Sequence, residues 1–191
     1  MREVENPSEA FMGEGARGAV GACVTPLLEG ARPLLVELQA LLGTTPGGSP
    51  RRTCVGFDSA RVAMLLAVLD RHAGLFVSDQ DVFVNVAGGI KITDPAADLA
   101  LALALASSHK RVALPPGTLA LGELGLTGSL RPAARLEARI TEAGRLGFKR
   151  LLAPPARKRG AQAKRVETLA KQSGLQVLWC PTIAAALDQA F

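Results

Sequence analysis

The sequence predicts an α+β fold in which mixed β-sheets pack against helices, and three observations predict it. Two apolar runs around a Glu-Gly pair near residue 30 indicate a β-hairpin. An Ala/Leu segment that opens with an Asp-Pro cap at residue 94 indicates a buried helix. A strand, a helix and a second strand follow one another after residue 150. With 191 residues, 48% of them hydrophobic, the chain is long enough for one domain with a substantial core.

The N-terminal part begins with an irregular segment. Residues 1–17 are rich in Gly and Glu and show little periodicity, so we expect a linker there. Residues 19–28 and 33–42 form the two strands of the predicted hairpin. Residues 44–52 contain two prolines and two glycines, which predicts a loop without regular structure and with a basic tip.

The central part is predicted to hold two helices and a strand. Apolar residues recur at helical spacing from Ser59 to His72, and residues 81–86 alternate as a strand does. Asp94 is a suitable N-cap with Pro95 at the first helical position, and the helix is expected to reach about Ser108. Its leucines alternate as in a strand, but Ala and Leu are the best helix formers. An apolar surface on all sides predicts a buried central helix.

The C-terminal part is predicted to alternate between strands and helices. Residues 118–130 suit two strands with a turn near Gly128, and Pro132 is expected to start a helix. Residues 150–153, 158–172 and 175–179 suit a βαβ unit with parallel strands, and a short helix follows from residue 182.

Composition excludes several classes of protein. Cys23, Cys54 and Cys180 are far apart and form no CxxC pair, which argues against zinc fingers, iron-sulfur clusters and a disulfide framework. No cluster of His and Cys suggests a metal site, and three free cysteines suit a reducing cytoplasm. The polar N-terminus does not resemble a signal peptide, and the most apolar stretch, residues 96–106, is too short to span a bilayer. We therefore expect a cytoplasmic protein without a membrane partner.

Charge is distributed unevenly along the chain. Residues 1–95 contain 8 Lys and Arg against 11 Asp and Glu, whereas residues 96–191 contain 14 against 6. Such asymmetry is typical of a surface that meets phosphates or acidic partners, although a solvated charged face explains it equally well. Six Phe, one Trp and no Tyr leave little scope for stacking on bases, so any binding of nucleic acid would rest on charge.

Four motifs between residues 81 and 154 carry a family resemblance. They are DVFVNV at 81–86, TDPAAD at 93–98, GELGLTG at 122–128 and GFK at 147–149. This order resembles the proteolytic domain of Lon-type proteases, whose fold is called Lon protease-like or ribosomal protein S5 domain 2-like. Lon proteases carry a serine in Pro-Ser-Ala-Gly and a lysine in Gly-Leu-Lys. In this chain Ala96 stands at the serine position and Glu137 at the lysine position, which implies a pseudoprotease because a hydroxyl nucleophile needs a base.

A narrower resemblance covers essentially the whole chain. Its further blocks are MREVENPS at 1–8, LEGARP at 28–33, PRR at 50–52 and DVFVNVAGG at 81–89. With GELGL at 122–126, they resemble the C-terminal part of the RadA (Sms) family of bacterial DNA repair proteins. In that family a zinc motif and a RecA-like ATPase precede a Lon-like domain, and the full protein is a hexameric motor that promotes branch migration in homologous recombination.

The resemblance implies a division of the chain and of its chemistry. Residues 1–17 would be a linker from an absent upstream ATPase domain, and residues 18–191 would be the Lon-like domain. A full-length protein would be a DNA-dependent ATPase. This chain has no GxxxxGK[ST] phosphate loop, so we expect ATP, magnesium and zinc to bind only in the absent domains and no cofactor in this one.

The predicted function is a non-enzymatic scaffold that assembles as a homohexamer and binds single-stranded or branched DNA without reading bases. Recombinases and other repair proteins are further partners that the resemblance implies. Arginine outnumbers lysine in the basic groups, as suits phosphate contacts. The predicted DNA-binding residues are Arg51, Arg52, Lys110, Arg111, Arg131, Arg135, Arg139, Arg157, Lys158, Arg159, Lys164 and Arg165. Arg131, Arg135 and Arg139 are expected along one helical face because they are spaced by four residues.

Two alternatives remain open. The chain could be a purely structural module for oligomerisation or protein interaction, with surface charge that serves solubility. It could also be a hydrolase with an unrecognised site, which ranks last because no set of nucleophile, base and metal ligands is visible.

Overall fold

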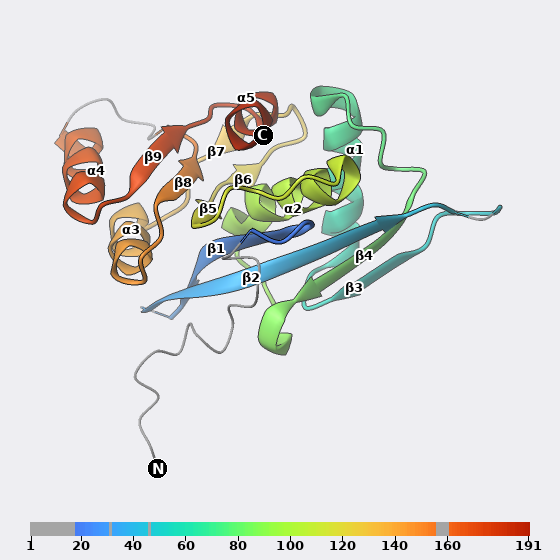
Figure 1. Ribbon diagram of the computed structural model, residues 1–191, viewed down its shortest axis with the longest axis horizontal. Coiled ribbons are helices and arrows are strands. Elements are labelled where there is room, and N and C mark those ends of the chain that lie inside the picture. The colour runs from blue at the N-terminus through green and yellow to red at the C-terminus, as the bar shows by residue number, and fades with distance from the viewer. Residues whose placement is uncertain (1–17, 31, 46, 156–160) are drawn as a thin grey trace, which may run out of the picture.

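A seven-stranded sheet forms the centre of the molecule, with strand order β3-β4-β2-β1-β5-β8-β9 (Figure 1). The computed structural model describes residues 18–30, 32–45, 47–155 and 161–191. The strands are β1 (Ala22–Glu29), β2 (Arg32–Gly43), β3 (Arg52–Val55), β4 (Asp81–Val86), β5 (Thr118–Ala120), β6 (Glu123–Leu124), β7 (Leu130–Arg131), β8 (Arg150–Ala153) and β9 (Gln176–Trp179). The helices are α1 (Ser59–Ala73), α2 (Asp98–Lys110), α3 (Leu136–Arg145), α4 (Ala161–Gln172) and α5 (Ile183–Ala190), with 3-10 turns η3 (Ala87–Gly89) and η4 (Pro95–Ala97).

The central sheet is mixed and mostly parallel. β1 pairs with β2 and β2 with β4 in antiparallel fashion. The pairs β1–β5, β3–β4, β5–β8 and β8–β9 are parallel. The predicted mixed sheet with packed helices is confirmed. The parallel pairing gives the fold an α/β character rather than the predicted α+β separation of strands and helices.

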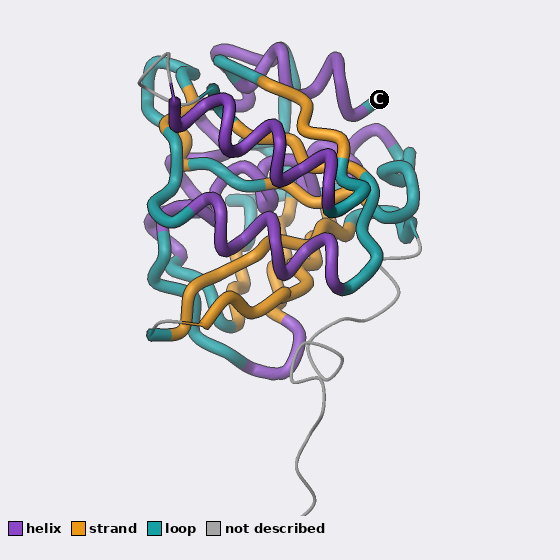
Figure 2. The backbone as a smooth tube through the Cα atoms, turned by 90° about the vertical axis from the view of Figure 1, so that its left-hand side faces the viewer, coloured by secondary structure: helices purple, strands orange, loops and turns teal. Residues whose placement is uncertain are grey.

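Helices cover the two faces of the sheet unequally. On one face α1, α2 and α5 enclose the larger hydrophobic cluster, which includes Leu38 of β2 and Val84 of β4. On the other face α3 and α4 lie side by side and enclose a second cluster with Val24 of β1 and Leu151 of β8 (Figure 2). Residues 98–107 of α2 are all buried, which confirms the predicted central helix.

Local signals located the hairpin and the two main helices. β1 and β2 form the predicted hairpin, in which Gly30 adopts a φ of 58°. Asp58 caps α1 by accepting a hydrogen bond from the Arg61 amide, and Gly74 closes it in the left-handed region. Asp94 caps as predicted, but the residues after it form η4 before α2 begins.

Three predicted boundaries were wrong. The loop predicted for residues 44–52 ends one residue earlier, because Arg52 begins β3 and pairs with Val82 of β4. β5 belongs to the large sheet, so the hairpin predicted in residues 118–130 is limited to β6 and β7. The third helix begins at Leu136 rather than Pro132, because Arg135 lies in the left-handed region at its N-cap.

The βαβ unit and the short final helix predicted for the C-terminal part are confirmed. β8 and β9 pair in parallel around α4, and Thr182 caps α5 by accepting from the Ala185 amide. The start predicted for α4 and the linker predicted for residues 1–17 lie outside the described residues. Among the described residues, no helix has the length and apolar character needed to cross a membrane.

Candidate functional site

Ala96, which the sequence analysis predicted at the position of a Lon serine, is buried in η4. Its amide donates to the Asp94 carboxylate at 3.0 Å, and its carbonyl accepts from the Gly122 amide at 2.8 Å. The methyl group is 2% exposed and belongs to the cluster beneath α3 and α4. The structure thus supplies a fixed backbone at this position and no nucleophilic atom on the side chain.

Arg139, rather than Glu137, forms an ion pair with Asp94, the residue that caps this turn. The Arg139 guanidinium donates to the Asp94 carboxylate at 2.7 Å, to the Ala134 carbonyl at 3.0 Å and to the Pro26 carbonyl. Arg139 and Ala96 line one hollow of about 370 Å³. The ion pair therefore joins β1, the turn before α2 and helix α3.

Glu137 lines a different groove. It lies with Lys164, Arg165 and Thr168 in a groove of about 360 Å³ between α3 and α4. In the described part of the chain, Ala96 and Glu137 line two different hollows. A lysine at position 137 would therefore lie in a different groove from the one that Ala96 lines.

Other hydroxyl and thiol groups are used structurally or are poorly ionised. The Ser107 hydroxyl accepts from the Gly21 amide and donates to the Val112 carbonyl, and the Ser108 hydroxyl accepts from the Leu42 amide. Burial raises the pKa of all three cysteine thiols, that of Cys180 to about 11. A thiol with a raised pKa is a weak nucleophile at neutral pH. The described residues also contain no cluster of three or more His, Cys, Asp or Glu that could hold a metal ion.

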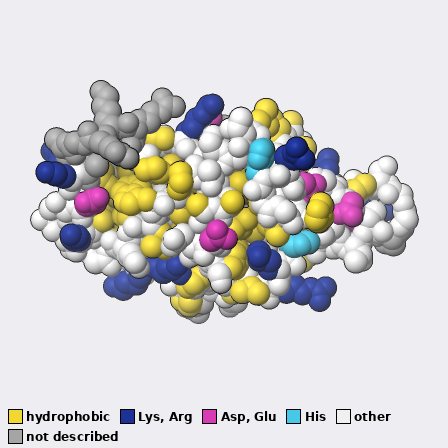
Figure 3. Space-filling view, turned by 90° about the horizontal axis from the view of Figure 1, so that it is seen from above, with side chains coloured by type: hydrophobic (Ala, Val, Ile, Leu, Met, Phe, Trp, Pro, Cys, Tyr) yellow, Lys and Arg dark blue, Asp and Glu magenta, His cyan; other side chains and the backbone are white. Residues whose placement is uncertain are grey.

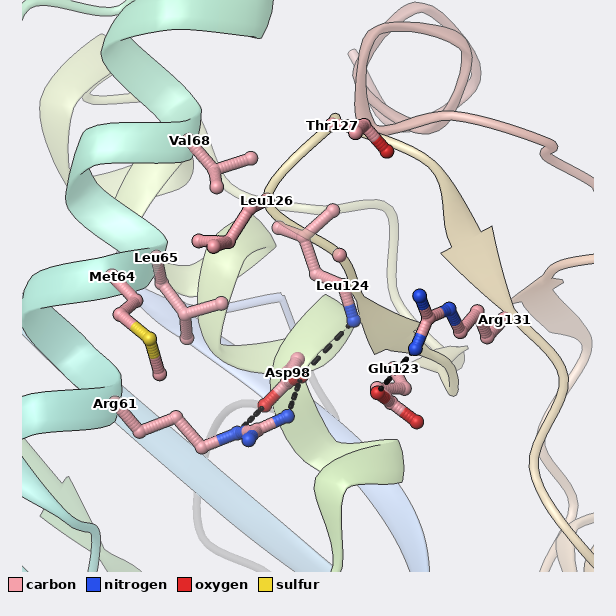
Figure 4. A pocket seen from close by; sticks show the side chains of 11 residues that line it. Arg61, Met64, Leu65, Val68, Asp98, Glu123, Leu124, Leu126, Thr127 and Arg131 are labelled. Atoms are coloured by element: carbon pink, nitrogen blue, oxygen red, sulfur yellow. Dashed lines mark hydrogen bonds and ion pairs between the residues drawn. The ribbon is translucent and has the colours of Figure 1, made fainter.

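A second hollow, of about 330 Å³, lies between α1 and the β6–β7 hairpin (Figure 4). Arg61 of α1 reaches the fully buried carboxylate of Asp98, with 2.5 Å between Nε and Oδ1. The Leu124 amide donates to the same carboxylate at 3.0 Å. Burial raises the pKa of the Asp98 carboxyl, and the hydrogen bonds from Arg61 and Leu124 oppose that rise.

The walls of this second hollow are apolar, and its charges are paired. Met64, Leu65, Val68 and Leu126 form one side, while Glu123 and Arg131 form an ion pair of 3.4 Å on the other (Figure 4). With its acidic and basic groups paired within the chain, the hollow suits an apolar side chain better than a phosphate.

Sequence reasoning did not identify the pair of Arg61 and Asp98. One signal was present: Asp98 is the single charged residue in an Ala/Leu segment, and a buried carboxylate requires a partner. Nothing in the sequence indicated which of the many arginines was that partner, because Arg61 lies 37 residues away.

The predicted DNA-binding residues fall into three groups. Eight are exposed, namely Arg51, Arg52, Lys110, Arg111, Arg131, Arg135, Lys164 and Arg165. Arg139 is buried, and its hydrogen bonds are made inside the protein, so its predicted place on a DNA-binding helical face was wrong. Arg131 lies in β7 and Arg135 precedes α3, so the three arginines share no helical face. Arg157, Lys158 and Arg159 lie outside the described residues.

Several exposed basic side chains have partners within the chain. Arg52 donates to the Ser78 carbonyl at 3.3 Å, Arg131 pairs with Glu123, and the Lys110 ammonium lies 5.6 Å from the centre of the Phe191 ring. On the face seen in Figure 3, Lys and Arg side chains are spread around the periphery with apolar surface between them. The basic residues seen on this face do not form a single continuous patch.

Comparison with known proteins gives a family match and close relatives. The family described as subunit ChlI of Mg-chelatase matches residues 50–157. The chain is 42% identical to DNA repair protein RadA of Bacillus subtilis (strain 168) over 98% of this chain and 39% of that protein. It is 49% identical to DNA repair protein RadA of Escherichia coli (strain K12) over 82% of this chain and 34% of that protein. The protein of the same name from Streptococcus pyogenes serotype M1 is 40% identical over 99% of this chain and 40% of that protein. The chain thus spans well under half the length of these relatives.

Proposed function

The chain belongs to the family described as subunit ChlI of Mg-chelatase and is of the RadA DNA repair type, and from this membership we propose that it is a non-proteolytic Lon-like scaffold for a DNA repair motor. Its role would be to assemble the motor as a hexamer and to hold DNA through phosphates during branch migration in homologous recombination. ATP hydrolysis would belong to other domains of a longer cytoplasmic protein. Similarity over 98% of the chain carries the proposal.

Burial at position 96 supports the non-proteolytic part of the proposal. The position holds a methyl group at 2% exposure, beside a guanidinium that is already hydrogen-bonded. A guanidinium keeps its protons at neutral pH and cannot act as a base. We expect no cleavage of unfolded casein by the chain, measured by gel electrophoresis over hours. Cleavage that is lost when Ser107 or Lys91 is replaced would contradict this part of the proposal.

Exposed arginine and lysine support the DNA-binding part. Eight predicted contacts lie at the surface, and six of them are arginines, which bind phosphate oxygens through two N–H groups. Contacts of this kind position a protein on DNA without reading its bases. The spread of the basic residues suits a ring, in which repeated weak contacts from several copies add to one another.

We expect the affinity for duplex DNA to fall steeply with salt, because phosphate contacts release bound cations. For four phosphate contacts the affinity should fall roughly 100-fold between 50 and 200 mM NaCl. Fluorescence anisotropy of a labelled duplex and of a labelled single strand gives the measurement. Equal affinity at the two salt concentrations would contradict DNA binding through phosphates.

Charge reversal tests which exposed residues are involved. Pairwise replacement by glutamate at Arg51 and Arg52, Lys110 and Arg111, Arg131 and Arg135, or Lys164 and Arg165 should weaken binding in at least one pair. The matched control is Arg71→Glu with Lys91→Glu, which changes the charge equally at exposed positions outside the predicted set. If the combined reversal of all eight residues binds as tightly as wild type, the DNA-binding part fails.

The alternative is a structural module for oligomerisation or protein interaction that does not touch DNA. The partners that Arg52, Lys110 and Arg131 already have within the chain favour this alternative. A gel shift beside sedimentation velocity separates the two proposals. Oligomers that leave DNA unshifted would favour the alternative, and a monomer that shifts DNA would separate binding from assembly.

A further inference from the structure

One end of the central sheet has an apolar face that no helix covers in the described part of the chain. On this side α3 contacts β1 and β2, and α4 contacts β9, whereas β3 and β4 have no comparable contact. Leu41, Val55 and Phe83 are 62%, 51% and 40% exposed there. Register places Phe83 between Leu41 of β2 and Thr53 of β3. We call the three apolar side chains the open face, and they line a hollow of about 660 Å³.

The open face points away from α1 and α2. Its strand neighbours Val82, Val84 and Cys54 pack into the cluster beneath those helices, and successive side chains of a strand point to opposite faces. Beside the open face, the Asn85 amide donates to the Gln39 side chain at 3.1 Å, so these polar groups pair with each other. An exposed apolar surface of this kind marks a contact with another segment or another protein.

The described chain begins at the rim of the same hollow. Residues 19–22 line it together with the open face. The Ala40 amide donates to the Gly21 carbonyl at 2.7 Å, which holds the start of the chain beside the residue that precedes Leu41. Gly21 has a φ of 78°, and a Cβ there would lie 2.3 Å from the Ala40 carbonyl oxygen, so glycine is needed for this close approach. Residues 1–17 are therefore attached next to the open face.

Residues 1–17 contain a suitable apolar pair within reach of the open face. Phe11 and Met12 are adjacent in a stretch of mostly small or polar residues. The six steps from Met12 to Gly18 span up to about 20 Å at roughly 3.3 Å per residue. β3, the outermost strand, lies three strand spacings from β1, which is about 14 Å. The pair can therefore reach every part of the open face.

The charges of this segment also suit the border of the open face. Residues 1–17 contain four Glu and two Arg. Arg51 and Arg52 are exposed at the start of β3, and neither forms an ion pair with another described residue. An acidic segment beside a basic border is electrostatically complementary, which favours this direction of approach.

We propose that residues 1–17 cover the open face of their own chain, with Phe11 and Met12 packed against Leu41 and Phe83. Two aromatic rings in contact, and a thioether against a ring, are favourable pairs. Attachment at residue 18 gives this segment a high effective concentration at the open face, which a separate molecule lacks. The proposal depends neither on DNA binding nor on self-association.

A double-mutant cycle in the full chain tests the contact. Phe11→Ala and Phe83→Ala are compared alone and together by urea unfolding, followed by the fluorescence of Trp179. Each single variant should raise the unfolding equilibrium constant roughly 10-fold, and the double variant also roughly 10-fold, because one contact is lost only once. Phe76→Ala is the control, since Phe76 is 75% exposed and does not line the hollow, so its effect should multiply with that of Phe11→Ala.

An apolar-surface dye gives a second readout that does not depend on stability. Phe11→Asp with Met12→Asp should raise the fluorescence of bound ANS, because the open face becomes accessible. Adding Phe83→Asp should lower it again, and circular dichroism confirms that each variant is folded. An unchanged dye signal in the first variant overturns the proposal.

The cycle also separates other occupants of the open face. Effects of Phe11→Ala and Phe83→Ala that multiply to roughly 100-fold overturn the proposal and leave the open face to another protein. Coupling that disappears on dilution of the sample overturns it as well, because residues 1–17 of one copy would then cover the open face of a second copy. Coupling that is independent of concentration, together with the rise in dye fluorescence, is the result that we expect.

Discussion

Arg139→Ala is expected to lower the free energy of unfolding by about 3–5 kcal/mol, the usual range when one partner of a buried ion pair is removed. The side chain is 2% exposed and joins Asp94 to the Pro26 and Ala134 carbonyls. Its removal leaves these acceptors with fewer donors and creates a cavity beneath α3. Urea unfolding followed by the fluorescence of Trp179 measures the change.

Two further variants separate the stability that Arg139 contributes through its several hydrogen bonds from the stability that it contributes through its charge. Arg139→Lys keeps the charge but cannot reach all three acceptors, so we expect a smaller yet clear loss. Arg145→Ala removes an exposed arginine from the same helix, whose pair with Glu142 lies at the surface, and should stay close to wild type. If Arg139→Ala remains as stable as wild type but binds DNA more weakly, Arg139 would return to the set of phosphate contacts.

Arg61→Ala is expected to cost a similar amount, about 3–5 kcal/mol at neutral pH. The Asp98 carboxylate has no exposed surface on its side chain, and without Arg61 it would keep only the bond from the Leu124 amide. The double variant Arg61→Met with Asp98→Asn should recover most of the loss, because Asn still accepts from Leu124 and no charge is buried. Equal stability of the single and double variants would show that the buried charge is not the cause.

The loss in Arg61→Ala should also depend on pH. Burial already raises the pKa of the Asp98 carboxyl, and removing Arg61 takes away a bond that opposes the rise. A carboxyl whose pKa is higher in the folded state than in the unfolded state binds its proton more readily when folded. Its ionisation therefore destabilises the fold as pH rises from the unfolded pKa through the folded one. We expect the deficit relative to wild type to shrink in mildly acidic buffer and to be largest above the folded pKa.

Features encoded by adjacent residues were predictable from sequence. The hairpin at Gly30, the cap at Asp94, the helix near Thr182 and the βαβ order each depend on a few neighbouring residues, and the structure has them. β3 was missed because its four residues become a strand through pairing with β4, which lies about 30 residues further along the chain. Pairing at that distance leaves no periodic signal in so short a segment.

The site was less predictable than the fold, because a buried arginine and an exposed one look alike in sequence. Arg139 was grouped with Arg131 and Arg135 by its spacing, but Arg135 in the left-handed region prevents one continuous helix from carrying all three. The position of Asp98 in an Ala/Leu segment indicated a buried charge, but it did not indicate which residue pairs with it. The family resemblance directed attention to positions 96 and 137, yet gave no sign that Ala96 and Glu137 line separate hollows.

The ion pair between Asp94 and Arg139 has an evolutionary consequence. A serine introduced at position 96 would share its hollow with a guanidinium that cannot accept its proton. Changing that arginine to supply a base would first loosen β1, the turn before α2 and helix α3, which it holds together. Stepwise acquisition of a peptidase site at this position would therefore pass through a less stable intermediate with no activity to select.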